Sequence, residues 1–312
     1  MPSASSSRLG VTLCGIPLAT PIIAASGTFA YGVEFASIVD LNALGGFVVK
    51  GLSREPMDGN KPPRIWEASS GMINSIGLQN IGVRAFVRDK LPGLAHVKAA
   101  VFANVFGFAI ADYEEVIRVL EDAPGLSGYE LNVSCPNTKH GGIQFSADPV
   151  MLAEVVSAAK RLATKRPLIV KLSPNVGSIA VVARAAEEAG ADAISLVNTI
   201  VSLAVDARTR KPRIGAGFGG LSGPAIKPIA LRMVHEAWKS VKIPVVGLGG
   251  ISSGEDVAEF MIAGATAVEV GTANFWDPCA TVRIAQELDE FLQSEKIARA
   301  ADLTGTLQFP VK

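Results

Sequence analysis

The feature that most constrains this chain is a regular alternation of short apolar runs with amphipathic stretches. The amphipathic stretches 148–164, 178–189, 225–241 and 253–263 each begin near Ser, Asp, Pro or Gly, as helices commonly do. The apolar runs are rich in Val, Ile, Leu and Ala, which is typical of strands buried on both faces of a parallel sheet. There are eight such runs: 21–25, 46–50, 100–104, 128–132, 168–172, 193–197, 245–248 and 267–270. Eight strands alternating with helices predict an α/β fold, a (β/α)8 TIM barrel formed by residues 1–312 as a single domain.

Three further segments do not fit the plain alternation. Residues 9–20, with alternating apolar positions and Gly15, are expected to form an N-terminal hairpin that caps one end of the barrel. Residues 51–91 and 200–224 are too long for plain loops, and long insertions in barrels often form binding walls or lids. The basic run 208–213 within the second insertion is interpreted as a solvated hairpin tip.

Composition excludes several classes of protein. The 29 basic and 29 acidic residues balance, so no charge excess favours nucleic acid or an anionic membrane surface. The three cysteines lie far apart, which argues against a disulfide framework and fits a reducing, cytoplasmic location. No apolar run resembles a signal peptide or a membrane span. The three histidines have no metal-ligand spacing, and we expect no metal site.

The stretch from Tyr129 to Thr138 is the strongest candidate for chemistry. A short strand runs directly into Asn132, Ser134, Cys135 and Asn137. The proline at position 136 disfavours helical geometry at Cys135, so the thiol is expected on a turn at the end of a strand. That end of a parallel barrel is where ligands bind. A lone cysteine is more often a small buried hydrophobe, but these polar neighbours favour a functional thiol.

Glycines follow the last two predicted strands. Gly249-Gly250 come after run 245–248, and Gly271-Thr272 after run 267–270. The loops after the seventh and eighth strands of barrels often bind phosphate, because glycine lets backbone N–H groups approach the oxygens. Tight turns also need glycine, but its occurrence in two successive units favours a cofactor that carries phosphate.

Lysines and amides end other predicted strands. Lys50 and Lys171 fall at strand ends, where a buried ammonium needs an anion or a strong acceptor. The alternative for these lysines is an ion pair with a carboxylate, for which Glu130 is the nearest candidate. The candidate site combines lysines, amides, one thiol and a phosphate-binding motif, but it has no acid/base pair and no metal. Such a site suits a cofactor that supplies the chemistry itself. Flavin mononucleotide (FMN) fits that description.

Taken together, these motifs resemble a known family. Residues 132–137 (Asn-Val-Ser-Cys-Pro-Asn), residues 74–78 (Asn-Ser-Ile-Gly-Leu) and the two C-terminal glycine motifs resemble dihydroorotate dehydrogenase of class 1, from about residue 9 onward. The continuation 138–145 resembles class 1B, the catalytic subunit of an NAD-linked enzyme. The resemblance implies oxidation of (S)-dihydroorotate to orotate in pyrimidine biosynthesis, with FMN as the cofactor.

The resemblance also implies a role for individual residues. Cys135 would take the C5 proton of dihydroorotate while the C6 hydride goes to flavin N5, and Lys171 would lie at the N1/O2 edge of the flavin. The substrate contacts would be Lys50, Asn74, Ser75, Ile76, Gly77, Leu78, Asn132, Asn137, Asn198 and Thr199. The cofactor contacts would be Ser26, Lys50, Gly51, Asn104, Asn132, Lys171, Val197, Gly223, Gly249, Gly250, Gly271 and Thr272.

Class 1B further implies a partner. Such chains work as a homodimer core within a heterotetramer, with a subunit that carries FAD and a 2Fe-2S cluster and passes electrons to NAD. Three alternatives remain open: a class 1A-like enzyme that uses fumarate, a flavoenzyme similar to dihydropyrimidine dehydrogenase, and a non-catalytic barrel that binds a phosphate ligand and in which Cys135 is structural.

Overall fold

Eight parallel strands close into a barrel in the computed structural model, which describes residues 8–134, 136–137 and 143–310. Their order around the barrel is β11-β12-β17-β18-β3-β4-β7-β8, and every neighbouring pair is parallel. The barrel strands are β3 (Ile22–Ala24), β4 (Gly46–Val48), β7 (Ala100–Val105), β8 (Gly128–Asn132), β11 (Leu168–Lys171), β12 (Ala193–Leu196), β17 (Val245–Leu248) and β18 (Ala267–Val270). The predicted TIM barrel is confirmed, and each of the eight apolar runs matches one of its strands to within two residues at either end.

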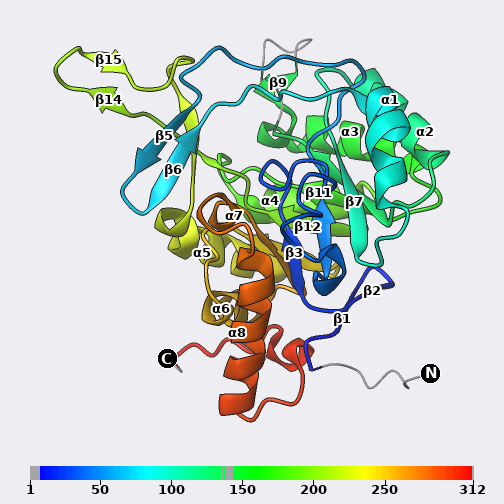
Figure 1. Cartoon of the computed structure of the whole chain (residues 1–312), viewed down its shortest axis with the longest axis vertical. Helices are drawn as coiled ribbons and strands as arrows, with labels where there is room; N and C mark the ends of the chain where they lie inside the picture. The colour runs from blue at the N-terminus through cyan, green and yellow to red at the C-terminus, as the bar shows by residue number, and fades with distance from the viewer. Residues whose placement is uncertain (1–7, 135, 138–142, 311–312) are drawn as a thin grey trace.

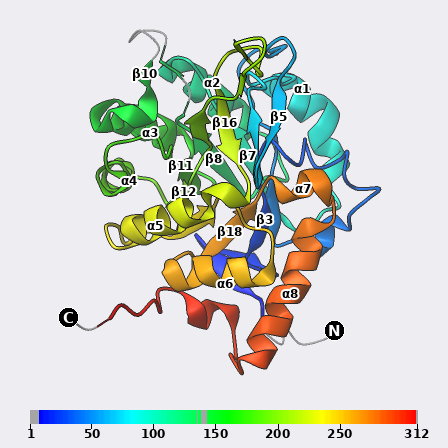
Figure 2. The same cartoon turned by 90° about the vertical axis from the view of Figure 1, so that its left-hand side faces the viewer.

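Helices surround the barrel and bury their apolar faces against it (Figure 2). They are α1 (Val83–Ala85), which continues into a π-helical turn (Phe86–Lys90), α2 (Ile110–Glu121), α3 (Pro149–Leu162), α4 (Ile179–Glu188), α5 (Lys227–Trp238), α6 (Gly254–Ala263), α7 (Ala273–Trp276) and α8 (Ala280–Ser294). Short 3-10 helices occupy Leu41–Ala43, Leu91–Leu94, Phe145–Ala147, Pro224–Ile226 and Ala300–Leu303. No helix in the described part of the chain is both long and apolar enough to cross a membrane.

The N-terminal hairpin forms as expected, from β1 (Val11–Leu13) and β2 (Ile16–Leu18). Its inward side chains Leu13 and Leu18 are buried in the main core. The thiol of Cys14 donates to the backbone oxygen of Asp192, which precedes β12. The hairpin therefore packs against the end of the barrel where the strands begin, opposite the end where ligands are expected (Figure 1).

The two long insertions meet in an antiparallel sheet above the other end of the barrel. Its order is β13-β16-β6-β5, with β5 (Ile65–Ala68) and β6 (Gly71–Asn74) from the first insertion, and β13 (Ile200–Ser202) and β16 (Gly219–Ser222) from the second. The hairpin β14 (Val205–Asp206) and β15 (Lys211–Pro212) projects from it into solvent (Figure 1). Both turn residues Arg208 and Arg210 are exposed, as expected for a hairpin tip. A last two-stranded sheet pairs β9 (Pro136–Asn137) with β10 (Ile143–Gln144).

Packing between helix α6 and strand β17 gives a test of the core. Phe260 on α6 is fully buried, and a Cβ added at Gly247 would meet its ring at 2.5 Å. Phe260→Ala should destabilise the chain by about 3–5 kcal/mol, because it removes a buried ring and leaves a cavity. The measurement is the midpoint of urea unfolding. The matched control Phe309→Ala, at a ring that is 66% exposed, should change the midpoint far less. Equal effects of the two substitutions would contradict this packing.

Candidate functional site

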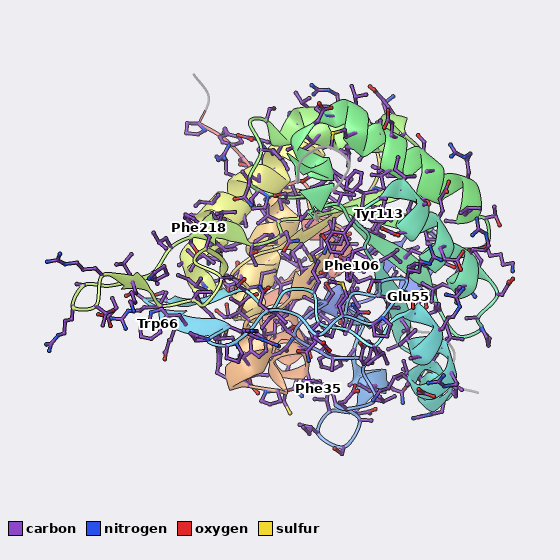
Figure 3. The ribbon with its side chains drawn as sticks, turned by 90° about the horizontal axis from the view of Figure 1, so that it is seen from above. Phe35, Glu55, Trp66, Phe106, Tyr113 and Phe218 are labelled. Atoms are coloured by element: carbon purple, nitrogen blue, oxygen red, sulfur yellow. The ribbon has the colours of Figure 1, made fainter. Side chains whose placement is uncertain are left out.

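A cavity of about 610 Å³ opens at the carboxyl ends of the barrel strands. The strand ends and the loops that follow them form its floor and sides. Met72, Asn74, Val201 and Gly220 from the antiparallel sheet also line it. The two insertions therefore build a wall of this cavity, as the sequence suggested. Seen from above, Phe106 lies near the middle of the molecule, just beyond β7, and its side chain lines the cavity (Figure 3).

The structure brings most of the predicted site residues together around this cavity. Nineteen of them line it: Ser26, Lys50, Gly51, Asn74, Ser75, Ile76, Gly77, Leu78, Asn104, Asn132, Lys171, Val197, Asn198, Thr199, Gly223, Gly249, Gly250, Gly271 and Thr272. Cys135 lies outside the described residues. Asn137 is described only through the backbone pairing of β9 with β10. The roles of all these residues stay predictions.

Lys50 lies just beyond β4 and lines the cavity without an anionic partner. Its backbone N–H donates to the oxygen of Ala30 at 2.7 Å, which fixes the chain at this point. Within the described ranges, no carboxylate pairs with its ammonium group. Burial, and then the positive charge of Arg64, lower the pKa of Lys50 below its usual value. A half-buried cation of this kind favours an anionic ligand in the cavity.

Lys171 is different, because it ends β11 in contact with two carboxyl groups. Its Nζ lies 2.8 Å from Oε2 of Glu269 and 3.2 Å from both carboxyl oxygens of Glu130. Burial lowers the pKa of Lys171, but the two carboxyl groups outweigh burial and raise it above its ordinary value. Lys171 is therefore a fixed cation at the cavity floor. The ion pair with Glu130, weighed above as an alternative, does form.

Amide side chains line the next part of the wall. Asn198 donates through Nδ2 to Oγ of Ser134 at 3.1 Å and to Oδ1 of Asn132 at 3.5 Å. Oδ1 of Asn132 also accepts from the backbone N–H of Ser134, while Oδ1 of Asn198 accepts from Thr199. These bonds fix the orientation of both amides. The Nδ2 group of Asn132 is free to donate to a ligand, since no acceptor for it lies among the described residues.

The glycine motifs that follow β17 and β18 form a backbone cradle in another part of the cavity wall. Gly249 and Gly250 have φ of +127° and +85°, and a Cβ at Gly250 would meet the backbone oxygen of Gly223 at 2.9 Å. In the part of the chain that the structure describes, no protein acceptor is present for the N–H groups of Gly249, Gly250, Gly271 or Thr272. Four unpaired donors on glycine-rich backbone suit the oxygens of a phosphate. The residues present therefore fit the phosphate end of FMN.

The helix that follows the first glycine pair does not contribute its N-terminus to this cradle. Ser253 caps α6 by accepting from the N–H of Asp256, and the Asp256 carboxylate accepts from the N–H groups of Ser252 and Ser253. Glu287 accepts from the N–H of Gly254. These donors are already satisfied inside the protein. At this turn, the N–H groups left to contact a phosphate therefore include those of Gly249 and Gly250.

Sequence reasoning missed several residues of the cavity wall. Thr28, Ser173, Asn175, Ser222 and Glu269 all line it. Glu269 was the most detectable of these, because it is the one charged residue in the apolar run 267–270. A buried carboxyl in a barrel strand needs a partner, and in the structure that partner is Lys171. Among the described residues, no group of three or more His, Cys, Asp or Glu side chains could hold a metal ion.

Comparison with known proteins agrees with this geometry. Residues 8–292 match the family model described as dihydroorotate dehydrogenase. The chain is 72% identical over 302 residues to "Putative dihydroorotate dehydrogenase A (fumarate)" of Solibacter usitatus, covering 97% of this chain and 99% of that protein. It is 50% identical to "Dihydroorotate dehydrogenase B (NAD(+)), catalytic subunit" of Pelobacter propionicus and of Geobacter sulfurreducens, covering 96% of this chain and 98% of each relative. The chain belongs to the dihydroorotate dehydrogenase family.

Proposed function

We propose that this chain binds FMN in the strand-end cavity and oxidises dihydroorotate to orotate, with fumarate as the electron acceptor. The observation that carries the proposal is the convergence of an unpaired Lys50, fixed amides and a glycine cradle on one cavity. Dihydroorotate is a partly saturated ring with amide edges and a carboxylate. Amides suit the ring edge and an unpaired ammonium suits the carboxylate.

The protein's own residues have distinct tasks in this reaction. FMN, when bound, supplies the two-electron oxidant. Lys50 would bind the carboxylate of the substrate, and Asn132 and Asn198 would orient the ring. Cys135 would act as the base that takes the C5 proton, in keeping with its position one residue beyond Ser134 at the cavity wall. Lys171, fixed at the floor, would face the electron-rich edge of the cofactor.

Fumarate is proposed as the acceptor because the relative named for fumarate is 72% identical, whereas the relatives named for NAD are about 50% identical. Fumarate is also a small dicarboxylate, and the unpaired Lys50 suits such an anion as well as it suits the substrate. The NAD-linked reading favoured by residues 138–145 is the second candidate. Those residues include 138–142, which lie outside the described part of the chain.

If fumarate is the acceptor, the chain needs no electron-transfer subunit, and a homodimer fits this proposal. The projecting side of the molecule carries exposed apolar side chains, among them Trp66 (37% exposed) and Phe218 (62%). Trp66 and Phe218 both lie on the projecting side of the molecule (Figure 3). Apolar side chains gathered on one exposed face often mark a protein interface. We propose this face as the contact between two copies of the chain.

The FMN site is tested by a substitution in the glycine cradle. Gly250→Ala should weaken FMN binding roughly tenfold or more, which corresponds to about 1.4 kcal/mol. The reason is that the added methyl group strains a positive φ and displaces the backbone next to Gly223. The measurement is FMN affinity by fluorescence quenching. Gly177→Ala is the matched control, since its Cβ would meet nothing within 4 Å, and it should bind FMN normally. Equal affinity of the two variants would argue against a phosphate site here.

The role of Cys135 is tested by removing its thiol. Cys135→Ala should lower turnover of dihydroorotate roughly 100- to 10,000-fold, the usual contribution of a general base. Bound FMN should be retained. In the unsubstituted chain, turnover should rise with pH toward about 8.5, the ordinary pKa of a thiol. Cys279→Ala, at an exposed thiol, is the control and should leave turnover unchanged. Normal turnover by the Cys135 variant would exclude the thiol as the base.

The acceptor is tested with the purified chain alone. Dihydroorotate oxidation should proceed with fumarate and should be negligible with NAD, since no second subunit is present to carry electrons. The measurement is orotate formation by absorbance under anaerobic conditions. An artificial dye acceptor serves as the positive control for the flavin site. Turnover with the dye but not with fumarate would overturn the fumarate proposal and favour the NAD-linked reading.

A further inference from the structure

Three ionisable side chains are buried together beneath the cavity. They are Glu130 on β8, Lys171 on β11 and Glu269 on β18, and they are 0%, 4% and 2% exposed. Two carboxylates and one ammonium group would leave a net negative charge in the barrel interior. Burying an uncompensated charge is costly, and two adjacent carboxyl groups avoid it by sharing one proton. The count of charges therefore requires one neutral carboxylic acid in this cluster.

The hydrogen bonds identify which carboxyl group is neutral. Glu130 accepts from Nδ2 of Asn104 at 2.6 Å, from Oγ of Ser195 at 3.0 Å and from Oγ of Ser26 at 3.3 Å, in addition to Lys171. Four donors around one carboxyl group stabilise its ionised form. Among the described residues, Glu269 has only Lys171 as a donor, and its carboxyl group also hydrogen-bonds to Glu130. The proton therefore resides on Glu269, which donates it to Glu130.

The position of the cluster gives the neutral acid a task. Lys171 and Glu269 line the cavity, whereas Glu130 lies behind them and does not. The cavity floor thus presents an ammonium group and a neutral carboxylic acid, with the negative charge placed below. An electron-rich ligand bound above the floor would contact the Lys171 ammonium group, which its hydrogen bonds hold in one orientation. Ionisation of Glu269 would instead bring a second negative charge to the floor, beside the ligand.

We propose that Glu269 is a protonated positioning residue that donates to Glu130, accepts from Lys171 and so aims the Lys171 ammonium group at the cofactor. The proposal rests on the proposed FMN site only in naming the ligand that Lys171 faces. Burial, and then the charge of Glu130, raise the pKa of Glu269 well above its ordinary value. Burial opposes ionisation of Glu130, but Lys171 and the neighbouring donors outweigh it and lower its pKa.

The surroundings of Glu269 contain no other charged group in the described part of the barrel interior. The strands beside it present Ile23 from β3 and Leu248 from β17, and the rest of the barrel presents the neutral donors already named. Lys50 lines the same cavity but neither hydrogen-bonds nor pairs with the cluster. The titration of Glu269 is therefore set by Glu130, Lys171 and burial.

The first test is the pH dependence of stability in the chain without FMN. A carboxyl group with a raised folded-state pKa contributes most stability below its unfolded pKa, near 4.5, and loses that contribution as pH rises through the folded pKa. Glu269→Gln has no proton to lose. The melting temperature of Glu269→Gln minus that of the unsubstituted chain should therefore increase as pH is raised from about 5 to about 9. A constant or decreasing difference would overturn the proposal.

A second measurement needs no variant. The infrared spectrum of the unsubstituted chain at neutral pH should contain the carbonyl band of a protonated carboxylic acid, and a spectrum without this band would overturn the proposal. It keeps the test decisive if Glu269→Gln does not fold.

The third test concerns FMN. Glu269→Leu removes one of the two carboxyl acceptors of Lys171 and should weaken FMN binding roughly tenfold, whereas Glu269→Gln keeps an acceptor at this position and should remain within about threefold of the unsubstituted chain. Equal losses in the two variants would overturn the positioning role. Failure of the unsubstituted chain to bind FMN would reject the proposed function instead, and would leave the pH and infrared tests of the proton intact.

Discussion

Closure of eight parallel strands is the constraint on which the rest of this structure depends. In a closed parallel barrel every strand ends on the same side, so residues from Ser26 to Thr272 meet at one cavity although they are spread along the whole chain. The same closure buries the side chains that point inward below that cavity. Each polar group placed there must find its partner among the other strands, which is why Glu130, Lys171 and Glu269 form one cluster.

The barrel was predictable because its strands are short apolar runs bounded by polar residues or glycine. Strands β8, β17 and β18 have the predicted bounds. Strand β4 ends at Val48 rather than Lys50, because the N–H of Lys50 leaves the barrel ladder and bonds to Ala30. The pairing of β6 with β16 was not predictable. These strands are separated by more than 140 residues, and the glycines of β16 have little intrinsic preference for a strand.

The site was predictable where its chemistry lies at strand ends. Glycines, amides and lysines that follow an apolar run can be recognised without knowing their spatial neighbours. The capping of α6 could not be foreseen in the same way, because the Ser253 hydroxyl and the Asp256 carboxylate satisfy donors that a helix N-terminus would otherwise offer. Glu269 stands out in the sequence as the one charged residue of its apolar run, but its partner Lys171 lies 98 residues earlier and only the fold brings the two together.

Lys50 and Lys171 differ in their surroundings because they occupy different positions in the barrel. Both lie at strand ends and both line the cavity, so the sequence treats them alike. Lys171 points into the closed interior, where two carboxyl groups fix it and raise its pKa. Lys50 lies two residues beyond its strand, where burial and Arg64 lower its pKa and no carboxylate is within reach among the described residues. The charge of Lys171 is already compensated by carboxyl groups of the protein. Lys171 can therefore orient a neutral or weakly charged ring, because it does not need a negative charge from the ligand. An uncompensated cation gains most from a ligand that brings a full negative charge. We therefore propose that the carboxylate of a substrate or acceptor binds at Lys50 and that the ring of the cofactor lies over Lys171.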